Sequence, residues 1–469
     1  MLQNAEKMDQ PVKTQAEYTA LLHTVLGARY GDAPRAFVHT YGCQGNVADG
    51  ERIKGMLAEM GYLFTDTVES ADLVLYNTCA VREHAEDRVF GNVGALKNRK
   101  AARPGMVVAL CGCMMQQPRV AEKIRRSYPF VDLVFGTHVI HRLPELLYRT
   151  LCGRNRVFEL PDEAGSITEG LPVVRDSSFK AFLPVMYGCN NFCSYCIVPY
   201  VRGRERSRMV EAVLEEARSL VEAGYRDITL LGQNVNSYGK DLETPVPFAQ
   251  LLREINAIPG DFRIRFMTSH PKDCTRELLD AMADCEKVAK HLHLPFQSGN
   301  DRVLKEMNRR YTREQYLELI RYARQVMPEL SLTSDVIVGF PGETYEAFQD
   351  TLSLVEEVGF TSLFTFIFSP REGTPAAKMP DPVSRRKSRW FRELTDLQER
   401  VASARNQKLL GKRFRVLVEG PGKKAGLLAG RTEGNLVIEF PGGDSLIGEF
   451  VEVVVTEALA WILRGQMEI

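Results

Sequence analysis

The chain has 469 residues, of which 44% are hydrophobic and 26% are charged, a composition that is normal for a globular protein of about three domains. No apolar run approaches the length of a membrane span. Lys plus Arg equals Asp plus Glu at 60 each, so the net charge of the chain does not indicate a nucleic-acid partner. Ten cysteines favour metal or redox chemistry in a reducing compartment over a disulfide framework.

Residues 1–34 are polar, carry acids among their bases and contain one amphipathic segment, around residues 16–26, that predicts a helix. Residues 1–34 as a whole have the features of neither a secretory signal nor a transit peptide. We therefore interpret it as an N-terminal extension and expect a cytoplasmic protein without a membrane partner.

Residues 35–151 alternate between short apolar runs and helical patterns. Strands are predicted at residues 36–40, 73–77, 106–110 and 133–135, and helices at residues 51–60, 83–100 and 120–127. Such alternation predicts a doubly wound parallel sheet with helices on both faces.

Cys43, Cys79 and Cys113 each follow the carboxyl end of one of these strands. Ligands of parallel sheets gather at those ends, so the three thiols can converge and hold an iron-sulfur cluster. The alternative is three unrelated buried cysteines, because cysteine is among the most buried residue types. Cys111 is a rival for Cys113, which we favour because it lies closer to the end of its strand.

The polar segment 152–174, which contains several Pro and Gly residues, is interpreted as a linker. Beyond it, Cys189, Cys193 and Cys196 have C-x3-C-x2-C spacing after an apolar run. Three thiolates can hold three irons of a 4Fe-4S cluster and leave the fourth iron open, whereas a structural zinc site needs a fourth ligand that the loop lacks. With Tyr195 before the third cysteine, the loop resembles that of the radical S-adenosylmethionine (SAM) superfamily. In that superfamily the open iron chelates SAM, and an electron from the cluster splits it to a 5′-deoxyadenosyl radical.

Residues 175–405 contain six strand-helix units, which predict an open half-barrel. Their strands are expected at residues 182–186, 227–231, 263–267, 291–295, 332–338 and 363–368. Polar groups follow the strand ends, at the edge where α/β barrels bind ligands, although turn or capping roles are an alternative. The predicted SAM contacts are Tyr195, Gln233, Ser269, Gln297, Asp335 and Ile337.

Residues 380–411 predict a charged connecting helix, and the short β runs of residues 408–469 predict a small antiparallel β-barrel. Residues 408–431 hold seven cations against Glu419, and such asymmetry can give the barrel a basic face for phosphates. Ordinary surface charge is the better interpretation for an isolated barrel, but attachment to a radical SAM domain favours RNA binding. The predicted RNA contacts are Arg202, Arg204, Arg206, Lys412, Arg413, Arg415, Lys423 and Lys424.

Ordered motifs over nearly all of the chain from residue 36 resemble the methylthiotransferase family. They are Tyr41-Gly-Cys-Gln-Gly-Asn46, Asn77-Thr-Cys-Ala-Val-Arg-Glu83, Gly112-Cys-Met-Met-Gln116, the cluster loop with its Val-Pro-Tyr-Val-Arg-Gly-Arg-Glu205 continuation, His293-Leu-Pro-Phe-Gln-Ser-Gly299, Ser334-Asp-Val-Ile-Val-Gly-Phe-Pro-Gly-Glu343 and Ser369-Pro-Arg-Glu-Gly-Thr-Pro375. The resemblance implies a methylthiotransferase domain (35–151), a radical SAM domain (175–405) and an RNA-binding TRAM domain (408–469). It also makes Cys113 the third ligand of the first trio. Gly45 is a departure, because the family usually has methionine there.

The resemblance implies two 4Fe-4S clusters and SAM as cofactors. The cluster on Cys43, Cys79 and Cys113 would carry the sulfur that one SAM methylates, while the Cys189 cluster would cleave a second SAM. The continuation after the cluster loop favours members that act on N(6)-dimethylallyladenosine next to the anticodon of tRNA. We therefore expect the anticodon stem loop and a low-potential electron donor as partners of a monomer. The alternatives are threonylcarbamoyl-adenosine, a ribosomal-protein aspartate, or a non-catalytic iron-sulfur RNA-binding protein.

Overall fold

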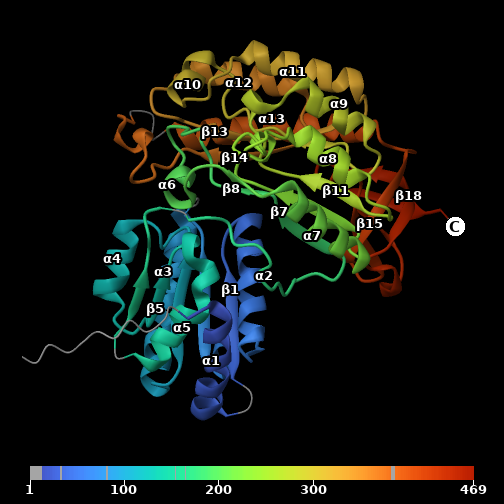
Figure 1. Cartoon of the computed structure of the whole chain (residues 1–469). Helices are drawn as coiled ribbons and strands as arrows, with labels where there is room; N and C mark the ends of the chain where they lie inside the picture. Colours follow the sequence, from blue (N-terminus) through green and yellow to red (C-terminus); the bar gives the residue numbers. More distant parts are fainter. Residues whose placement is uncertain are drawn as a thin grey trace, which may run out of the picture. The chain divides into compact units, whose positions relative to one another are not determined.

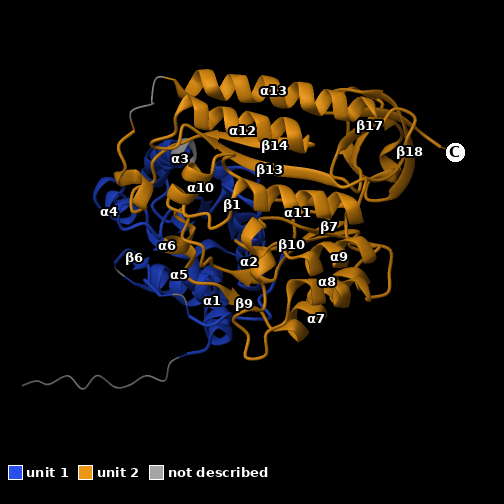
Figure 2. Ribbon diagram, turned by 90° about the horizontal axis from the view of Figure 1, so that it is seen from above, with its two compact units in different colours: residues 1–174 blue, residues 175–469 orange. Residues whose placement is uncertain are grey.

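The computed structural model describes residues 13–31, 34–80, 83–153, 155–163, 165–381 and 386–468, without the side chains of residues 83–85. The chain forms two compact units, with the boundary between Val174 and Arg175, and Figure 2 colours them separately. Residues 1–12 of the predicted extension and residues 81–82 of the second cysteine motif lie outside the described residues.

The first unit contains a six-stranded parallel sheet in the order β2-β1-β3-β4-β5-β6 (Figure 1). Its strands are β1 (Arg35–Thr40), β2 (Leu63–Phe64), β3 (Leu73–Thr78), β4 (Val107–Gly112), β5 (Leu133–Phe135) and β6 (Val157–Glu159). The predicted parallel sheet is confirmed. Because β1, β3 and β4 are neighbours with the same direction, their carboxyl ends lie side by side.

Helices cover both faces of this sheet, as predicted. They are α1 (Gln15–Tyr30), α2 (Gln44–Glu59), α3 (Glu83–Ala102), α4 (Pro118–Ser127) and α5 (Leu143–Cys152). Leu73 and Leu75 of β3 pack with α1, α2 and α5, whereas Val74 and Tyr76 pack with α3 and α4 on the other face. The period of two along a strand that is buried on both faces explains why its apolar run is continuous.

Two interpretations of the sequence need correction here. Residues 152–174, interpreted as a linker, include β6, which pairs with β5 at the edge of the sheet. The predicted N-terminal extension includes α1, whose Leu22 and Leu26 are buried in the core of the unit. In addition, α2 begins at Gln44, seven residues before its predicted start at residue 51, so Cys43 is its N-cap residue.

The second unit begins with six parallel strands that form the predicted half-barrel. They are β7 (Lys180–Pro184), β10 (Asp227–Leu231), β11 (Arg263–Phe266), β12 (His291–His293), β13 (Ser331–Val338) and β14 (Ser362–Ile367). Pairing runs β7-β10-β11 and β12-β13-β14, and a parallel bridge between Ile264 and Val288 lies between the two sheets. The helices of this part are α6 (Val198–Arg202), α7 (Val210–Glu222), α8 (Phe248–Asn256), α9 (Arg276–Asp284), α10 (Asp301–Glu306), α11 (Arg313–Val326), α12 (Tyr345–Val358) and α13 (Lys387–Gln407).

A closed five-stranded barrel follows α13. Its strands are β15 (Arg413–Pro421), β16 (Leu427–Arg431), β17 (Val437–Pro441), β18 (Phe450–Ala458) and β19 (Leu463–Met467). The barrel was predicted as antiparallel, from four β runs at residues 413–418, 427–431, 436–440 and 449–456. The fifth strand, β19, closes it by pairing parallel with β17, because the turn after β18 returns the chain beside β17.

A turn of this barrel contacts the N-terminal ends of the half-barrel strands. Arg265 donates to the carbonyl oxygen of Thr432 at 2.8 Å, and the backbone N–H of Lys290 donates to Glu433 at 3.0 Å. These bonds leave the carboxyl ends of the strands as the edge where a ligand site is expected. Within the described residues, no helix combines the length and the apolar character that crossing a membrane requires.

Candidate iron-sulfur and SAM site

Cys43, Cys79 and Cys113 come from the three adjacent strand ends of the first unit. Cys43 precedes α2, Cys79 follows β3, and Cys113 follows β4. A Cβ at Gly42, where φ is +122°, would lie 2.5 Å from the Cβ of Cys79. Only glycine therefore lets the backbone before Cys43 approach Cys79 so closely.

Asn46 connects this cysteine trio. The Cys43 thiol donates to Asn46 Oδ1 at 3.3 Å, and Asn46 Nδ2 lies 3.9 Å from Cys113 Sγ. The same amide donates to the carbonyl oxygen of Thr78, the residue before Cys79, at 3.2 Å. One fully buried side chain from the first turn of α2 thus touches two of the thiols and the backbone beside the third. Sequence reasoning missed Asn46, although it stands in the Tyr41–Asn46 motif.

Cys111 lies apart from this arrangement. Its side chain is fully buried in the core between the sheet and α1, α2 and α5. Burial also raises the pKa of the Cys111 thiol well above its usual value. This placement supports Cys113 over Cys111 as a ligand.

In the second unit, the loop with Cys189, Cys193 and Cys196 follows β7 by way of the short strand β8 (Met186–Tyr187). β8 pairs antiparallel with β9 (Arg206–Ser207), so the Val-Arg-Gly-Arg-Glu continuation lies beside the loop. A Cβ at Gly188, where φ is +76°, would lie 1.9 Å from the carbonyl oxygen of Arg204. Cys189 N–H donates to the carbonyl oxygen of Gly203 at 3.1 Å. The motif continuation therefore forms one wall of the cluster loop.

Side chains from elsewhere in the unit hold the rest of the loop. Asn308 Nδ2 donates to the carbonyl oxygens of Asn191 and Phe192 at 3.2 and 2.9 Å. Ser194, between the second and third cysteines, donates through its hydroxyl to the carbonyl oxygen of Glu306 at 2.8 Å. Protein hydrogen bonds therefore hold the cysteine loop in place without a bound cluster.

Arg309 is the functional candidate that sequence reasoning missed in this unit. Its side chain is buried, with 4% of the residue exposed, and it donates to Cys193 Sγ at 3.4 Å. Further bonds lead to the carbonyl oxygen of Pro295 at 2.6 Å and to Tyr311 Oη at 3.1 Å. An arginine next to another arginine in a polar turn has no sequence signal that separates it from a surface residue.

The two cysteine trios fit iron-sulfur clusters better than single metal ions. Among the residues that the structure describes, no three His, Cys, Asp or Glu side chains are close enough to hold one metal ion. In a 4Fe-4S cluster each thiolate binds a different iron, so the three thiols need not surround a single ion. Burial raises the pKa of Cys189 and of Cys196 to about 12, so cluster binding must release protons from these thiols.

Buried polar atoms without a partner mark the carboxyl ends of the half-barrel strands. Ser269 Oγ and His270 Nε2 after β11, Asn234 Oδ1 after β10, and Gln297 Oε1 after β12 have no hydrogen-bond partner within the described part of the chain. Unpaired buried polar groups cost about 1–3 kcal/mol each, so four on neighbouring strand ends indicate a polar ligand. SAM, with its amino, carboxylate, ribose and adenine groups, fits this donor and acceptor set. All four residues belong to the polar groups that the sequence places after the strand ends, and Ser269 and Gln297 are among the predicted SAM contacts.

The other predicted SAM contacts have different surroundings. Gln233 Oε1 accepts from the backbone N–H of Gly188 at 2.5 Å, so this side chain supports the cluster loop. Asp335 Oδ1 lies 3.5 Å from His293 Nε2. Tyr195 and Ile337 pack against one small hydrophobic cluster with Phe340. His293 also shares the Thr333 hydroxyl with His291, as expected of histidines inside a barrel.

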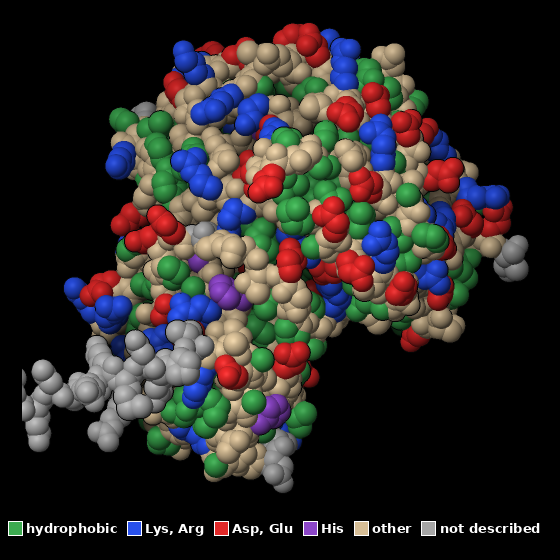
Figure 3. All heavy atoms as spheres, viewed as in Figure 1, with side chains coloured by type: hydrophobic (Ala, Val, Ile, Leu, Met, Phe, Trp, Pro, Cys, Tyr) green, Lys and Arg blue, Asp and Glu red, His purple; other side chains and the backbone are tan. Residues whose placement is uncertain are grey.

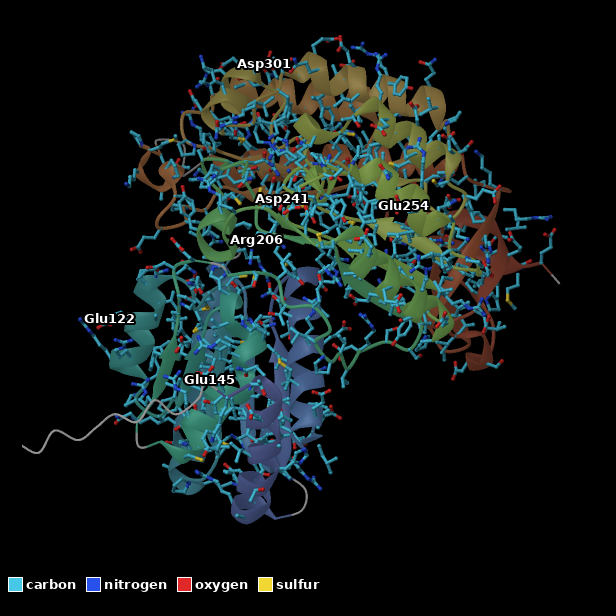
Figure 4. The ribbon with its side chains drawn as sticks, in the orientation of Figure 1. Glu122, Glu145, Arg206, Asp241, Glu254 and Asp301 are labelled. Atoms are coloured by element: carbon cyan, nitrogen blue, oxygen red, sulfur yellow. The ribbon has the colours of Figure 1, made fainter. Side chains whose placement is uncertain are left out.

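The predicted RNA contacts divide by exposure and pairing. Arg202 is buried, Arg204 is exposed, and burial lowers the pKa of Arg206. Ser207, next to Arg206, donates to Asp241 at 2.6 Å, and Figure 4 labels Arg206 and Asp241. Of the three arginines in this run, Arg204 therefore has the exposure that phosphate binding needs.

In the C-terminal barrel, most of the predicted cations are already paired. Lys412, Arg413 and Arg415 form ion pairs with Glu329, Glu468 and Asp261, respectively. Lys423 and Lys424 are exposed in the β15–β16 turn and have no ion pair within the described residues. Figure 3 shows Lys and Arg interspersed with Asp and Glu over the visible side of this unit.

Three family models match the chain in the expected order. Residues 35–136 match uncharacterized protein family UPF0004, residues 183–355 match the radical SAM superfamily, and residues 407–467 match the TRAM domain. The structure of a radical S-adenosylmethionine methyltransferase, TsrM, from Kitasatospora setae covers 74% of this chain and is itself covered to 75%, with a TM-score of 0.53 and 16% identity. That likeness shows the fold. The half-barrel and its three-cysteine loop define a radical SAM enzyme.

Similarity to curated relatives shows which family of radical SAM enzymes the chain belongs to. A tRNA-2-methylthio-N(6)-dimethylallyladenosine synthase from Acetivibrio thermocellus is 52% identical over 432 residues, 92% of this chain and 90% of that protein. One from Alkaliphilus oremlandii is 51% identical over 439 residues, 93% of each chain. The chain belongs to the family of tRNA-2-methylthio-N(6)-dimethylallyladenosine synthases. The domain boundaries at residues 35, 175 and 408 remain our proposal.

Proposed function

We propose that this chain is a radical SAM tRNA methylthiotransferase, which places a methylthio group at ring position 2 of N(6)-dimethylallyladenosine next to the anticodon. The observation that supports this proposal most strongly is the similarity to four synthases named for that product, at 47–52% identity over 92–97% of this chain. The placement of both cysteine trios at strand ends supports it. Electron-carrier or RNA-binding proteins need no second three-thiol site.

Cys189, Cys193 and Cys196 would hold the 4Fe-4S cluster that binds SAM, and Cys43, Cys79 and Cys113 would hold a second one. When bound, these groups supply the radical and the sulfur, which acid-base side chains cannot do at an aromatic C–H bond. Before a cluster binds, Asn46 Oδ1 would hold the Cys43 thiol, and Asn46 Nδ2 would still be able to donate to Cys113 Sγ once the thiols have lost their protons.

The chain's own residues would bind SAM at the carboxyl ends of the half-barrel strands. Asn234, Ser269, His270 and Gln297 offer unpaired polar atoms there. Burial lowers the pKa of His270 far below its usual value, so its ring is neutral. Because Nδ1 accepts from the backbone N–H of Lys272 at 3.1 Å, Nε2 carries the proton and can donate without a charge. Neutral partners bind the ribose and adenine without competing with the cluster for the SAM carboxylate.

The anticodon stem loop would be held by exposed cations, with Arg204 beside the cluster loop and Lys423 and Lys424 on the TRAM barrel. A low-potential protein would supply the electron. We propose that the chain acts as a monomer in the cytoplasm, where its tRNA substrate would be found.

The deciding experiment is anaerobic turnover of the reconstituted protein with prenylated tRNA, SAM and a reductant, followed by nucleoside mass spectrometry. The 2-methylthio nucleoside and 5′-deoxyadenosine are expected. Parallel reactions with threonylcarbamoyl-adenosine tRNA and with the ribosomal protein should give no product. Preferred reaction with either of these substrates would replace the proposed function, and absence of 5′-deoxyadenosine would favour a non-catalytic protein.

A further inference from the structure

Two aromatic side chains on β14 are exposed although their strand belongs to the half-barrel. Phe364 is 49% exposed and Phe366 is 37% exposed, whereas Leu363 between β14 and the helices is buried. Large exposed aromatic groups that share one face of a strand are unusual in a folded domain and typically mark a binding surface. In Figure 1, β14 lies beside β13 in this sheet.

Phe364 and Phe366 lie on the inner face of the half-barrel, the side opposite the helices. Leu363 packs in the core with Trp390 and Leu394 of α13, so its neighbour Phe364 faces the other way. The same alternation applies on β13, where Val336 and Val338 are in that core. Asp335 and Ile337 therefore share the inner face with the two phenylalanines.

The register brings these four residues together. Asp335 is paired with Phe364, and Ile337 with Phe366. The ring of Phe364 is 5.7 Å from the ring of His293, in an edge-to-face arrangement, and His293 Nε2 is 3.5 Å from Asp335. The aromatic pair thus continues the row of candidate SAM contacts toward the edge strand of the half-barrel.

We propose that Phe364 and Phe366 form an apolar subsite that receives the dimethylallyl group of the substrate adenosine. This inference rests on the proposed function. A dimethylallyl group is branched, flat at its double bond and uncharged, so two phenyl rings can remove it from water without leaving a polar atom unpaired. Ile337 supplies an aliphatic wall beside Phe366.

The charges around the subsite favour this occupant over the alternative substrates. A threonylcarbamoyl group and an aspartate side chain each carry a carboxylate. On this face a carboxylate would meet Asp335 and two phenyl rings, with like charge and loss of hydration opposing its binding. A subsite built in this way accepts the prenyl group and rejects both acids.

The test compares RNA binding by the full-length reconstituted protein and its Phe364→Ala, Phe366→Ala and double variants. The probes are two synthetic anticodon stem loops that differ only in N(6)-dimethylallyladenosine against adenosine. We expect the wild-type preference for the prenylated probe to fall about tenfold in the double variant, because that preference comes from burial of an apolar group. Affinity for the unmodified probe should stay unchanged.

Ile367→Ala is the matched control, since Ile367 is 39% exposed on the same strand but has the opposite orientation. Phe364→Leu keeps an apolar side chain and should retain most of the preference if the alanine variants do not fold. An unchanged preference in the soluble double variant, or an equal loss in Ile367→Ala, would overturn the subsite alone. If the wild-type protein neither prefers the prenylated probe nor forms the 2-methylthio product, the proposed function fails together with the subsite.

Discussion

The guanidinium of Arg309 donates a hydrogen bond to the sulfur of Cys193 across 3.4 Å inside the second unit. Its other partners are neutral oxygens of Pro295, Tyr311 and Tyr195, and no carboxylate forms an ion pair with it among the described residues. A buried cation without an acid is costly. An anionic cluster on Cys189, Cys193 and Cys196 would supply the missing negative charge.

Replacing Arg309 should therefore make this cluster harder to reduce. The reduced cluster carries one more negative charge than the oxidised one, so Arg309→Gln should lower the midpoint potential by roughly 50–100 mV, as expected for loss of a charge-assisted hydrogen bond of about 1–2 kcal/mol. The measurement is an EPR-monitored redox titration of protein whose Cys43, Cys79 and Cys113 are replaced by alanine. Arg309→Lys should restore part of the shift, and Arg310→Gln, at the exposed neighbour, should leave the potential unchanged. Equal potentials for Arg309→Gln and wild type at equal iron content would refute this role.

Replacement of single cysteines should show which of Cys111 and Cys113 is a cluster ligand and which is a core residue. Cys113→Ala should lower the iron content of the anaerobically reconstituted chain from about eight to about four atoms, because one of two 4Fe-4S clusters is lost. Cys111→Ala, two residues away, should keep about eight and lose only about 1 kcal/mol of stability through a small cavity. Iron and sulfide analysis decides the matter, and the reverse outcome would make Cys111 the ligand.

Gly188→Ala should disable the radical SAM cluster. Its Cβ would be 1.9 Å from the carbonyl oxygen of Arg204, and φ is +76°, so the loop would have to move away from its wall. We expect loss of about four irons and of 5′-deoxyadenosine formation. Gly426→Ala has a similar φ of +81° but open space around the Cβ, so it controls for backbone strain alone. Full activity in Gly188→Ala would show that the loop tolerates displacement.

Glu343 should make the stability of the protein fall as pH rises. Burial raises the pKa of this carboxyl to about 7, although the backbone N–H of Gly339 donates to it at 2.6 Å. The folded state therefore binds more protons than the unfolded state between about pH 4.5 and about pH 7, and the free energy of unfolding falls through that window by up to about 3 kcal/mol.

Glu343→Gln should remove this component, because the amide has no charge to bury. The check is the difference in thermal denaturation midpoint between pH 5 and pH 8 for the variant, the wild type and Glu356→Gln, an exposed glutamate of α12. The prediction fails if the wild type and Glu343→Gln show the same pH dependence.

Exposed and paired cations of the TRAM barrel should differ in their contribution to RNA affinity. The double change of Lys423 and Lys424 to alanine should weaken binding equally for prenylated and unmodified stem loops and reduce the slope of log affinity against log salt by about 1.5. The double change of Lys412 and Arg413 should have a smaller effect, since both are neutralised by Glu329 and Glu468. Binding isotherms at several salt concentrations measure this, and equal slopes in both double variants would contradict it.

By itself the sequence predicted most of the strands, the order of the three domains and the two cysteine trios, because periodicity, spacing and local motifs are written along the chain. It did not predict β6 or β19, whose places depend on pairing with distant strands. Asn46, Arg309, the exposed ring pair on β14 and the ion pairs that neutralise Lys412 and Arg415 were decided by the tertiary structure alone. Each of these depends on which distant side chain comes within hydrogen-bond, ring or ion-pair distance. Cys111 and Cys113 show the division most clearly: their spacing left both possible, and the burial of Cys111 against α2 and α5 favours Cys113.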